Sequence, residues 1–68
     1  MRNVVSEKIF ELRKEHHLSQ MALAKEIGVT QKSIDFWEKG INEPKASYII
    51  AMAKYFGVSA DYLLGLEI

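Results

Sequence analysis

The sequence predicts an all-α fold of five short helices, because signals that start and stop helices alternate along its 68 residues. Four start signals are side chains that can cap free backbone amides, at Asn3, Ser19, Thr30 and Ser59. A fifth is Pro44, which suits a first helical turn. Each of the four glycines follows a segment with helical apolar spacing, where a left-handed C-terminal cap suits glycine. No alternating β-branched run argues for a sheet.

These signals place the helices, in chain order, at about residues 4–16, 20–27, 31–39, 44–56 and 60–65 of a single domain spanning residues 1–68. Apolar residues three and four positions apart form one stripe on each helix, which can face a shared core. From the first helix to the fifth, the stripes consist of Val5, Ile9 and Leu12; Leu23, Ala24 and Ile27; Ile34 and Trp37; Ile49, Met52, Ala53 and Phe56; and Leu63. Three further apolar residues lie between helices, at Leu18, Val29 and Val58.

Composition restricts the function without identifying it. Nine basic and nine acidic side chains cancel, so a face that binds nucleic acid has to come from charge placement. The absence of cysteine excludes disulfides and thiolate metal sites. The apolar runs fall short of the roughly 18–20 residues that cross a bilayer, and charge appears too early at the amino terminus for a signal peptide. We therefore expect a soluble, cytoplasmic protein without a membrane partner.

No group of residues predicts catalysis. Glu7, Glu11 and Glu15 recur at four-residue spacing, which is typical of a solvated helix face. The adjacent histidines, His16 and His17, lack a third metal ligand. Nothing resembles a nucleophile–base pair or a phosphate-cradling glycine loop. We therefore expect no enzymatic activity, no cofactor and no metal.

The central segment, residues 18–38, predicts two short helices joined by a tight turn at residues 28–30. The small Ala24 lets the two helices approach, and Ile34 and Trp37 anchor the second helix to the core. The side chains left pointing away from the core are Gln31, Lys32, Asp35 and Phe36. This is the geometry in which a helix lays its first turn into a DNA major groove. An αα-hairpin that serves packing alone is the other interpretation.

Many further residues stand at fixed spacing through essentially the whole chain. They are Leu18-Ser19-Gln20, Leu23-Ala24, Ile27-Gly28-Val29, Ile34, Trp37-Glu38, Gly40, Pro44 and Gly57-Val58-Ser59, with Asp61, Leu63 and Leu64. This pattern resembles the lambdoid phage repressor and Cro superfamily, also called the xenobiotic-response-element regulators. The resemblance implies a five-helix domain in which the second and third helices form a helix-turn-helix. It also implies sequence-specific binding of double-stranded DNA by a transcriptional regulator, with repression as the expected role.

The resemblance assigns candidate DNA contacts to the two central helices. It implies that Gln20 contacts the DNA backbone and braces Gln31, whose amide can pair with adenine N6 and N7. Lys32 can reach guanine O6 and N7 or a phosphate, and Ser33 a phosphate or a thymine edge. Thr30, at the start of the third helix, completes this group. The alternative is that these side chains are ordinary solvated surface.

Two features depart from the family pattern. Phe36 stands where relatives usually have a polar or basic side chain that faces the groove. It predicts either contact with a thymine methyl group or packing, in a protein interface or under the following loop. Asn42 and Lys45 flank a loop that by resemblance lies along the phosphate backbone, but Glu43 would repel phosphates. We therefore expect a weak grip on the backbone that gains from dimer avidity.

Two structural features are also implied by the resemblance. Arg13 and Glu38 match a salt bridge that joins the first helix to the end of the third, and a planar guanidinium suits a carboxylate bidentately. His17 stands where relatives commonly have a glycine, so a left-handed backbone is expected there.

The tail of the chain and the charge balance predict the partners. Apolar Leu64 and Leu66 suggest a homodimer through the fifth helix, and hence a DNA operator with an inverted repeat. Phe36, Glu43 and the zero net charge keep a second function open. This is a protein-interaction module, such as an antitoxin, whose partner is a toxin or an antagonist.

Overall fold

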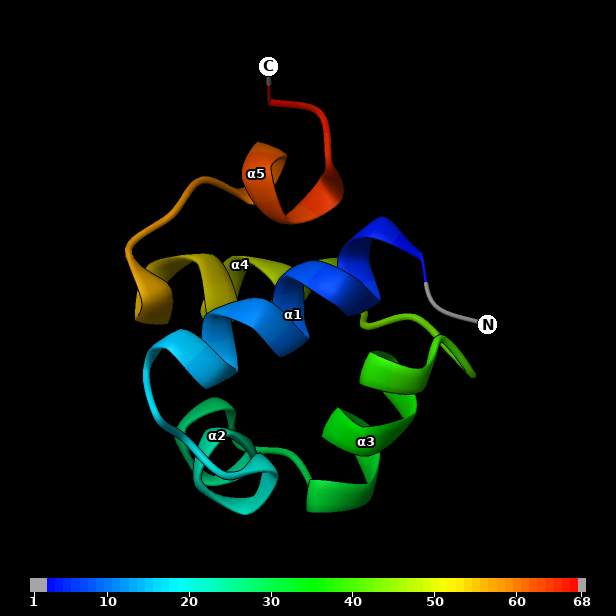
Figure 1. Ribbon diagram of the computed structural model, residues 1–68, viewed down its shortest axis with the longest axis vertical. Coiled ribbons are helices and arrows are strands. Elements are labelled where there is room, and N and C mark those ends of the chain that lie inside the picture. Colours follow the sequence, from blue (N-terminus) through cyan, green and yellow to red (C-terminus); the bar gives the residue numbers. More distant parts are fainter. Residues whose placement is uncertain (1–2, 68) are drawn as a thin grey trace.

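The computed structural model describes residues 3–67, which form five helices and no strand. The helices are α1 (Val4–Glu15), α2 (Gln20–Ile27), α3 (Gln31–Lys39), α4 (Ala46–Phe56) and α5 (Ala60–Leu64). In Figure 1, α1 crosses the middle of the molecule, with α2 and α3 on one side and α5 on the other. Among the described residues, no helix is long and apolar enough to cross a membrane. The all-α prediction is confirmed.

Four of the five predicted start signals cap helices. Asn3 forms a reciprocal capping box, in which its side chain accepts the Ser6 N–H at 2.9 Å and its own N–H donates to the Ser6 hydroxyl at 2.6 Å. Ser19, Thr30 and Ser59 each accept an N–H from the residue three positions further on. The helix ends also follow the pattern, since α2 to α5 each end at a glycine with a left-handed backbone.

The start of α4 differs from the prediction. The helix begins at Ala46 rather than at Pro44, and Lys45 occupies the N-cap position without a side-chain hydrogen bond. The backbone of Lys45 is extended, with φ −64° and ψ 159°. The fixed φ of proline is compatible with an extended segment as well as with a first helical turn, so Pro44 alone does not locate the helix start. The ends of α1 and α5 also come one residue earlier than expected.

One hydrophobic core holds the five helices together. Its buried members are Ile9, Leu12, Leu23, Ala24, Ile34, Trp37, Ile49, Met52, Ala53, Phe56 and Leu63. Each of these residues lies on a stripe that the sequence predicts, and every helix contributes at least one. Trp37 is only 6% exposed, and its ring lies 5.6 Å from that of Tyr48. The remaining predicted apolar residues are partly buried against the core, at Val5, Leu18, Ile27, Val29 and Val58.

Candidate nucleic-acid interface

A tight turn sets the position of α3 against α2. Gly28 ends α2 with φ 84°, a left-handed conformation that side-chain-bearing residues rarely adopt. The N–H groups of Gly28 and Val29 both donate to the Ala24 carbonyl, at 2.8 and 2.9 Å. Thr30 then caps α3 by accepting the Ser33 N–H at 3.1 Å. As a result, α3 begins at Gln31, directly after the turn.

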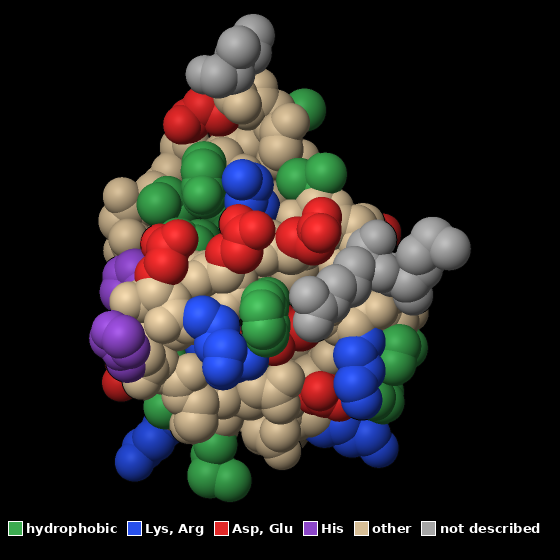
Figure 2. Space-filling view, in the orientation of Figure 1, with side chains coloured by type: hydrophobic (Ala, Val, Ile, Leu, Met, Phe, Trp, Pro, Cys, Tyr) green, Lys and Arg blue, Asp and Glu red, His purple; other side chains and the backbone are tan. Residues whose placement is uncertain are grey.

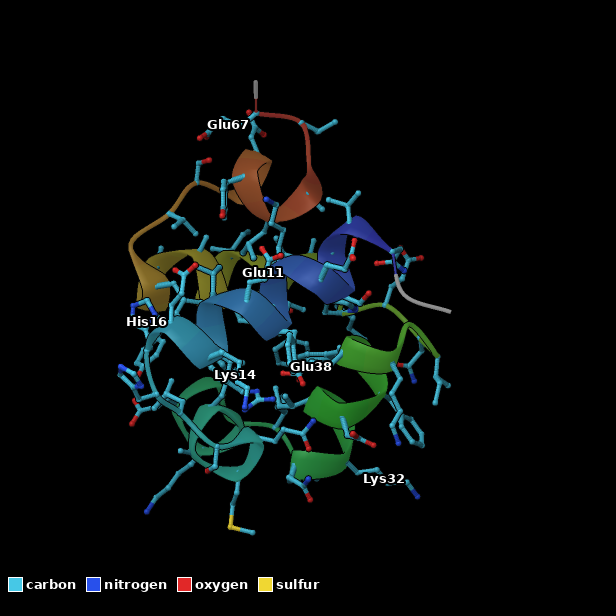
Figure 3. All side chains as sticks on the ribbon, in the orientation of Figure 1. Glu11, Lys14, His16, Lys32, Glu38 and Glu67 are labelled. Atoms are coloured by element: carbon cyan, nitrogen blue, oxygen red, sulfur yellow. The ribbon has the colours of Figure 1, made fainter. Side chains whose placement is uncertain are left out.

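The two faces of α3 have different surroundings. Ile34, Trp37 and Glu38 are buried. Gln31 and Lys32 are exposed, and three residues are half-buried: Ser33, Asp35 and Phe36. Figure 3 shows Lys32 projecting from α3 away from the other helices, whereas Glu38 points inward, toward α1. The outward set that the sequence predicts is therefore present on one face.

Arg13 and Glu38 form a buried ion pair between α1 and α3. The Arg13 Nε donates to Glu38 Oε2 at 2.6 Å, and its Nη2 donates to Glu38 Oε1 at 3.0 Å. The Arg13 Nη1 donates to the Leu18 carbonyl at 2.8 Å, which attaches the α1–α2 turn to the same group. The hydrogen bond to Glu38 raises the pKa of Arg13, and this outweighs burial, which lowers it. The pair therefore holds the carboxyl-terminal part of α3 against α1.

Gln20 extends this network to the outer surface. Its Nε2 donates to Glu38 Oε1 at 3.0 Å and to Asp35 Oδ1 at 3.2 Å. Its Oε1 accepts from the Gln31 Nε2 at 2.7 Å. Because a carboxylate can only accept, the amino group of Gln20 has to face the two acids, and its oxygen has to face Gln31.

The orientation of Gln20 determines what Gln31 offers to a ligand. Gln31 gives one amino hydrogen to Gln20. Its other amino hydrogen and its oxygen are left for a ligand. One donor beside one acceptor is the pairing that the major-groove edge of adenine requires. The carboxylates of Glu38 and Asp35 thus determine, through Gln20, which hydrogen-bonding groups Gln31 presents at the surface.

Sequence reasoning missed the part that Asp35 plays. Besides accepting from Gln20, it pairs with Lys39 at 2.9 Å. These contacts lower the pKa of Asp35, with the Lys39 bond as the larger cause. The spacing of Asp35 and Lys39, four residues apart on a helix, is a signal that could have identified the pair.

The other candidate residues surround a groove between α3 and the α3–α4 loop. The groove has a volume of about 360 Å³, and its lining consists of Thr30, Lys32, Ser33, Phe36, Trp37, Asn42, Glu43, Lys45 and Tyr48. Six of the eight predicted DNA contacts belong to it, and the remaining two are Gln20 and Gln31. The structure thus brings all eight to the α2–α3 side of the molecule.

Charge is unevenly distributed despite the neutral total. Figure 2 shows acidic side chains in a row over α1. Basic side chains lie mainly in the half of this face that α2 and α3 occupy, on the side where Lys14 and Lys32 are labelled in Figure 3. The placement of charge therefore distinguishes the α2–α3 side from the rest of this face.

Apolar side chains are exposed around α4 and α5. Leu64 and Leu66, the predicted dimer residues, are 42% and 69% exposed. A groove of about 320 Å³ between the start of α4 and α5 is lined by Pro44, Ala46, Ile49, Ile50, Ala60 and Leu64. Leu64 borders this groove and Leu66 does not. Ile50, which also lines the groove, is 50% exposed.

His17 adopts φ 55°, the left-handed backbone that the resemblance implied.

The chain is similar to known regulators along most of its length. A helix-turn-helix family model matches residues 9–63. Repressor protein C2 of Salmonella phage P22 is 36% identical over 61 residues, which cover 90% of this chain and 28% of that protein. The transcriptional repressor RstR of the cryptic phage CTXphi of Vibrio cholerae is 40% identical over 53 residues, or 78% of this chain and 48% of the relative. The regulator YobD of Bacillus subtilis is 33% identical over 60 residues, with 88% and 54% covered. This chain thus spans about half the length of these relatives or less.

Solved structures show the same fold. The P22 c2 repressor in complex with a synthetic operator superposes with a TM-score of 0.88 at 33% identity, covering 97% of this chain and all of that one. The SOS-response repressor LexA of Eubacterium rectale gives 0.85 at 29% identity, covering 96% and 72%. On the evidence of the family model, the relatives and the fold, this chain belongs to the helix-turn-helix family of the lambdoid repressor-like superfamily.

Proposed function

We propose that this domain binds double-stranded DNA at specific sequences and acts as a transcriptional repressor, with α3 in the major groove. The observation that carries the proposal is the hydrogen-bonded series from Glu38 through Gln20 to Gln31. A solvated surface glutamine needs no such support, whereas a glutamine that selects one base has to be held in one orientation. The P22 repressor, which shares this fold, has been solved on an operator.

Each candidate residue has a distinct role in this proposal. Gln31 pairs with an adenine edge, and Lys32 and Ser33 contact neighbouring bases or phosphates. Gln20 uses both amino hydrogens on carboxylates, so it binds a phosphate through its backbone N–H at the amino end of α2. Thr30, Asn42 and Lys45 border the same groove, and we assign them to the phosphate backbone.

The test compares a base-reading residue with a phosphate-binding one on a site selected from random duplex DNA. Gln31→Ala should weaken the preference at one base position by about 1–3 kcal/mol and leave non-specific binding nearly unchanged. Lys45→Ala should weaken binding to every DNA sequence by a similar factor and reduce the magnitude of the slope of log K against log salt by about one. Fluorescence anisotropy over a salt series measures both quantities.

Two outcomes would contradict the proposal. An equal, uniform loss in both variants would show that α3 does not read the sequence. If the domain captures a protein partner and shows no salt-dependent affinity for duplex DNA, the result would instead favour a protein-interaction module, because protein packing releases few counterions.

We also propose that the domain forms a homodimer through the apolar surface around α5. The two exposed leucines, and the groove that Leu64 borders, support it, since exposed apolar patches are typical of an interface. Leu64→Glu and Leu66→Glu should shift the sedimentation coefficient toward that of the monomer. Met21→Glu, at an apolar position on α2 that is as exposed as Leu66, is the matched control and should leave self-association unchanged.

The dimer proposal also specifies the operator. Half-sites should form an inverted repeat with centres about 34–36 Å apart. Full affinity of one subunit for a single half-site would contradict it.

A further inference from the structure

Phe36 and Lys32 form a pair on the outer side of α3 that neither the core nor the Gln20 network uses. The Lys32 ammonium lies 5.4 Å from the centre of the Phe36 ring, within the range of a cation–π contact. Phe36 is half-buried, and both side chains line the groove between α3 and the loop. An apolar ring and a cation are thus held together at the surface proposed to face DNA.

The chemistry of the major groove limits what this pair can select. The C5-methyl group of thymine is the apolar group on the unmodified base edges there, so it is where a phenylalanine ring gains contact. An ammonium group has only donors, and guanine presents two acceptors, O6 and N7, whereas cytosine presents a donor. The ring therefore favours a methylated pyrimidine, and the cation favours guanine.

We propose that Phe36 and Lys32 together read a C5-methylated pyrimidine beside a guanine, and that this makes binding sensitive to cytosine methylation at that step. The inference rests on the proposed DNA-binding function and names a specificity determinant within it. Thymine and 5-methylcytosine carry the methyl group on the same ring carbon, so the ring contacts either. Uracil and unmodified cytosine lack it.

The spacing of the pair fits two neighbouring base pairs. Base pairs stack about 3.4 Å apart along each strand. A methyl group contacts an aromatic carbon at about 3.5–4.0 Å, and an ammonium binds an acceptor at about 2.7–3.2 Å. Since each group approaches its base from the side, a separation of 5.4 Å allows both contacts at once. The cation–π contact also restricts the Lys32 side chain to the ring's neighbourhood.

The experiment removes or adds one C5-methyl group at a time in the selected site. In separate duplexes, each thymine is replaced by uracil, and each cytosine by 5-methylcytosine. Removing one methyl group from the wild-type site should weaken binding about fourfold at a single position, the value of one buried methyl group. If a cytosine occupies that position, its methylation should strengthen binding by the same factor.

Variants assign the effect to residues. In Phe36→Ala, and in Phe36→Gln as a second variant that keeps an extended side chain but replaces the ring by a polar amide, the affinity ratio of methylated to unmethylated duplex should fall to one. Lys32→Ala should lose the preference for guanine at the neighbouring pair and keep the methyl ratio. Lys45→Ala is the matched control, since it should weaken all duplexes and leave the ratio unchanged.

The outcomes separate this inference from the function on which it rests. Salt-dependent duplex binding with a methyl ratio of one at every pyrimidine would overturn the inference alone. Absence of salt-dependent duplex binding would overturn both. A methyl effect that persists in the two Phe36 variants would also overturn the assignment. Loss of self-association in those variants with unchanged DNA binding would place the ring in a protein interface instead.

Discussion

Two helix pairs differ in the surfaces that they present. The α2–α3 unit presents polar side chains held by hydrogen bonds, whereas the α4–α5 unit presents apolar side chains. In the α2–α3 unit, polar side chains are hydrogen-bonded in series from Glu38 through Gln20 to Gln31, and Arg13 of α1 holds Glu38. In the α4–α5 unit, apolar side chains such as Ile50 and Leu64 are exposed around a groove. α4 also begins without a side-chain cap.

This difference matches two kinds of recognition. Hydrogen bonds have strict geometry, so a network of them fixes the direction in which an exposed amide presents its donor and acceptor. Apolar contact has no preferred direction and grows with the area that is buried. The first arrangement suits selection of one base, and the second suits association with a complementary surface. Four predictions test this difference.

The largest effect should come from Trp37, which joins the two units. It belongs to α3, is 6% exposed, and packs its ring against Tyr48 of α4. Trp37→Ala should lower the free energy of unfolding by about 3–5 kcal/mol, because the cavity would lie in the shared core. Urea titration followed by circular dichroism measures the loss. A water-exposed emission spectrum for the native tryptophan would contradict the structure.

The next effect should come from the ion pair that attaches α3 to α1. Removing one partner of the Arg13–Glu38 pair leaves the other charge buried, and we expect a loss of about 3 kcal/mol from Arg13→Met or Glu38→Leu alone. The double variant should lose less than the sum of the single changes. A double-mutant cycle measures this coupling directly.

The same pair provides a readout that stability alone does not give. Glu38→Gln keeps the side chain's size but can present a donor to Gln20, which leaves Asp35, at 3.2 Å, as the remaining carboxylate that fixes the orientation of Gln20. The base preference at the position read by Gln31 should then weaken, whereas self-association through α5 should not. An unchanged base preference would show that Gln31 does not depend on Glu38.

Local patterns in the sequence predicted most of the fold. The capping side chains and the glycines act within one helical turn, so their effect is visible in a short segment. The core stripes follow from helical periodicity alone. Pro44 shows the limit of such signals, because its φ suits both an extended segment and a helix start.

Part of the site was also predicted, from resemblance to a family rather than from local patterns. The pairing of Arg13 with Glu38 and of Gln20 with Gln31 came from resemblance to a family, since nothing in a single sequence brings distant residues together. The participation of Asp35 in the network and of Ile50 in the apolar groove depends on how helices cross. That is a property of the packed structure rather than of any segment.

The smallest effect should appear at the edge of the network, where Asp35 meets solvent. Lys39 and Gln20 lower the pKa of Asp35 in the folded protein below its value in the unfolded chain, which is about 3.9. The folded state therefore binds this proton less readily than the unfolded state. The contribution to stability is present above the unfolded pKa and is lost as pH falls through the folded one.

Asp35→Asn isolates this charge, because asparagine keeps an oxygen that can accept from Gln20. The Tm of the wild type should exceed that of the variant at pH 6, and the difference should shrink as the pH falls below the unfolded pKa and vanish below the folded one. The Lys39 side chain is 60% exposed, so added salt should also reduce the difference by screening the pair. A Tm difference that persists at low pH would mean that Asp35 contributes through its shape rather than its charge. Asp35 would then stabilise the fold by packing, as the apolar side chains of the α4–α5 unit do, rather than by charge, as the Arg13–Glu38 pair does.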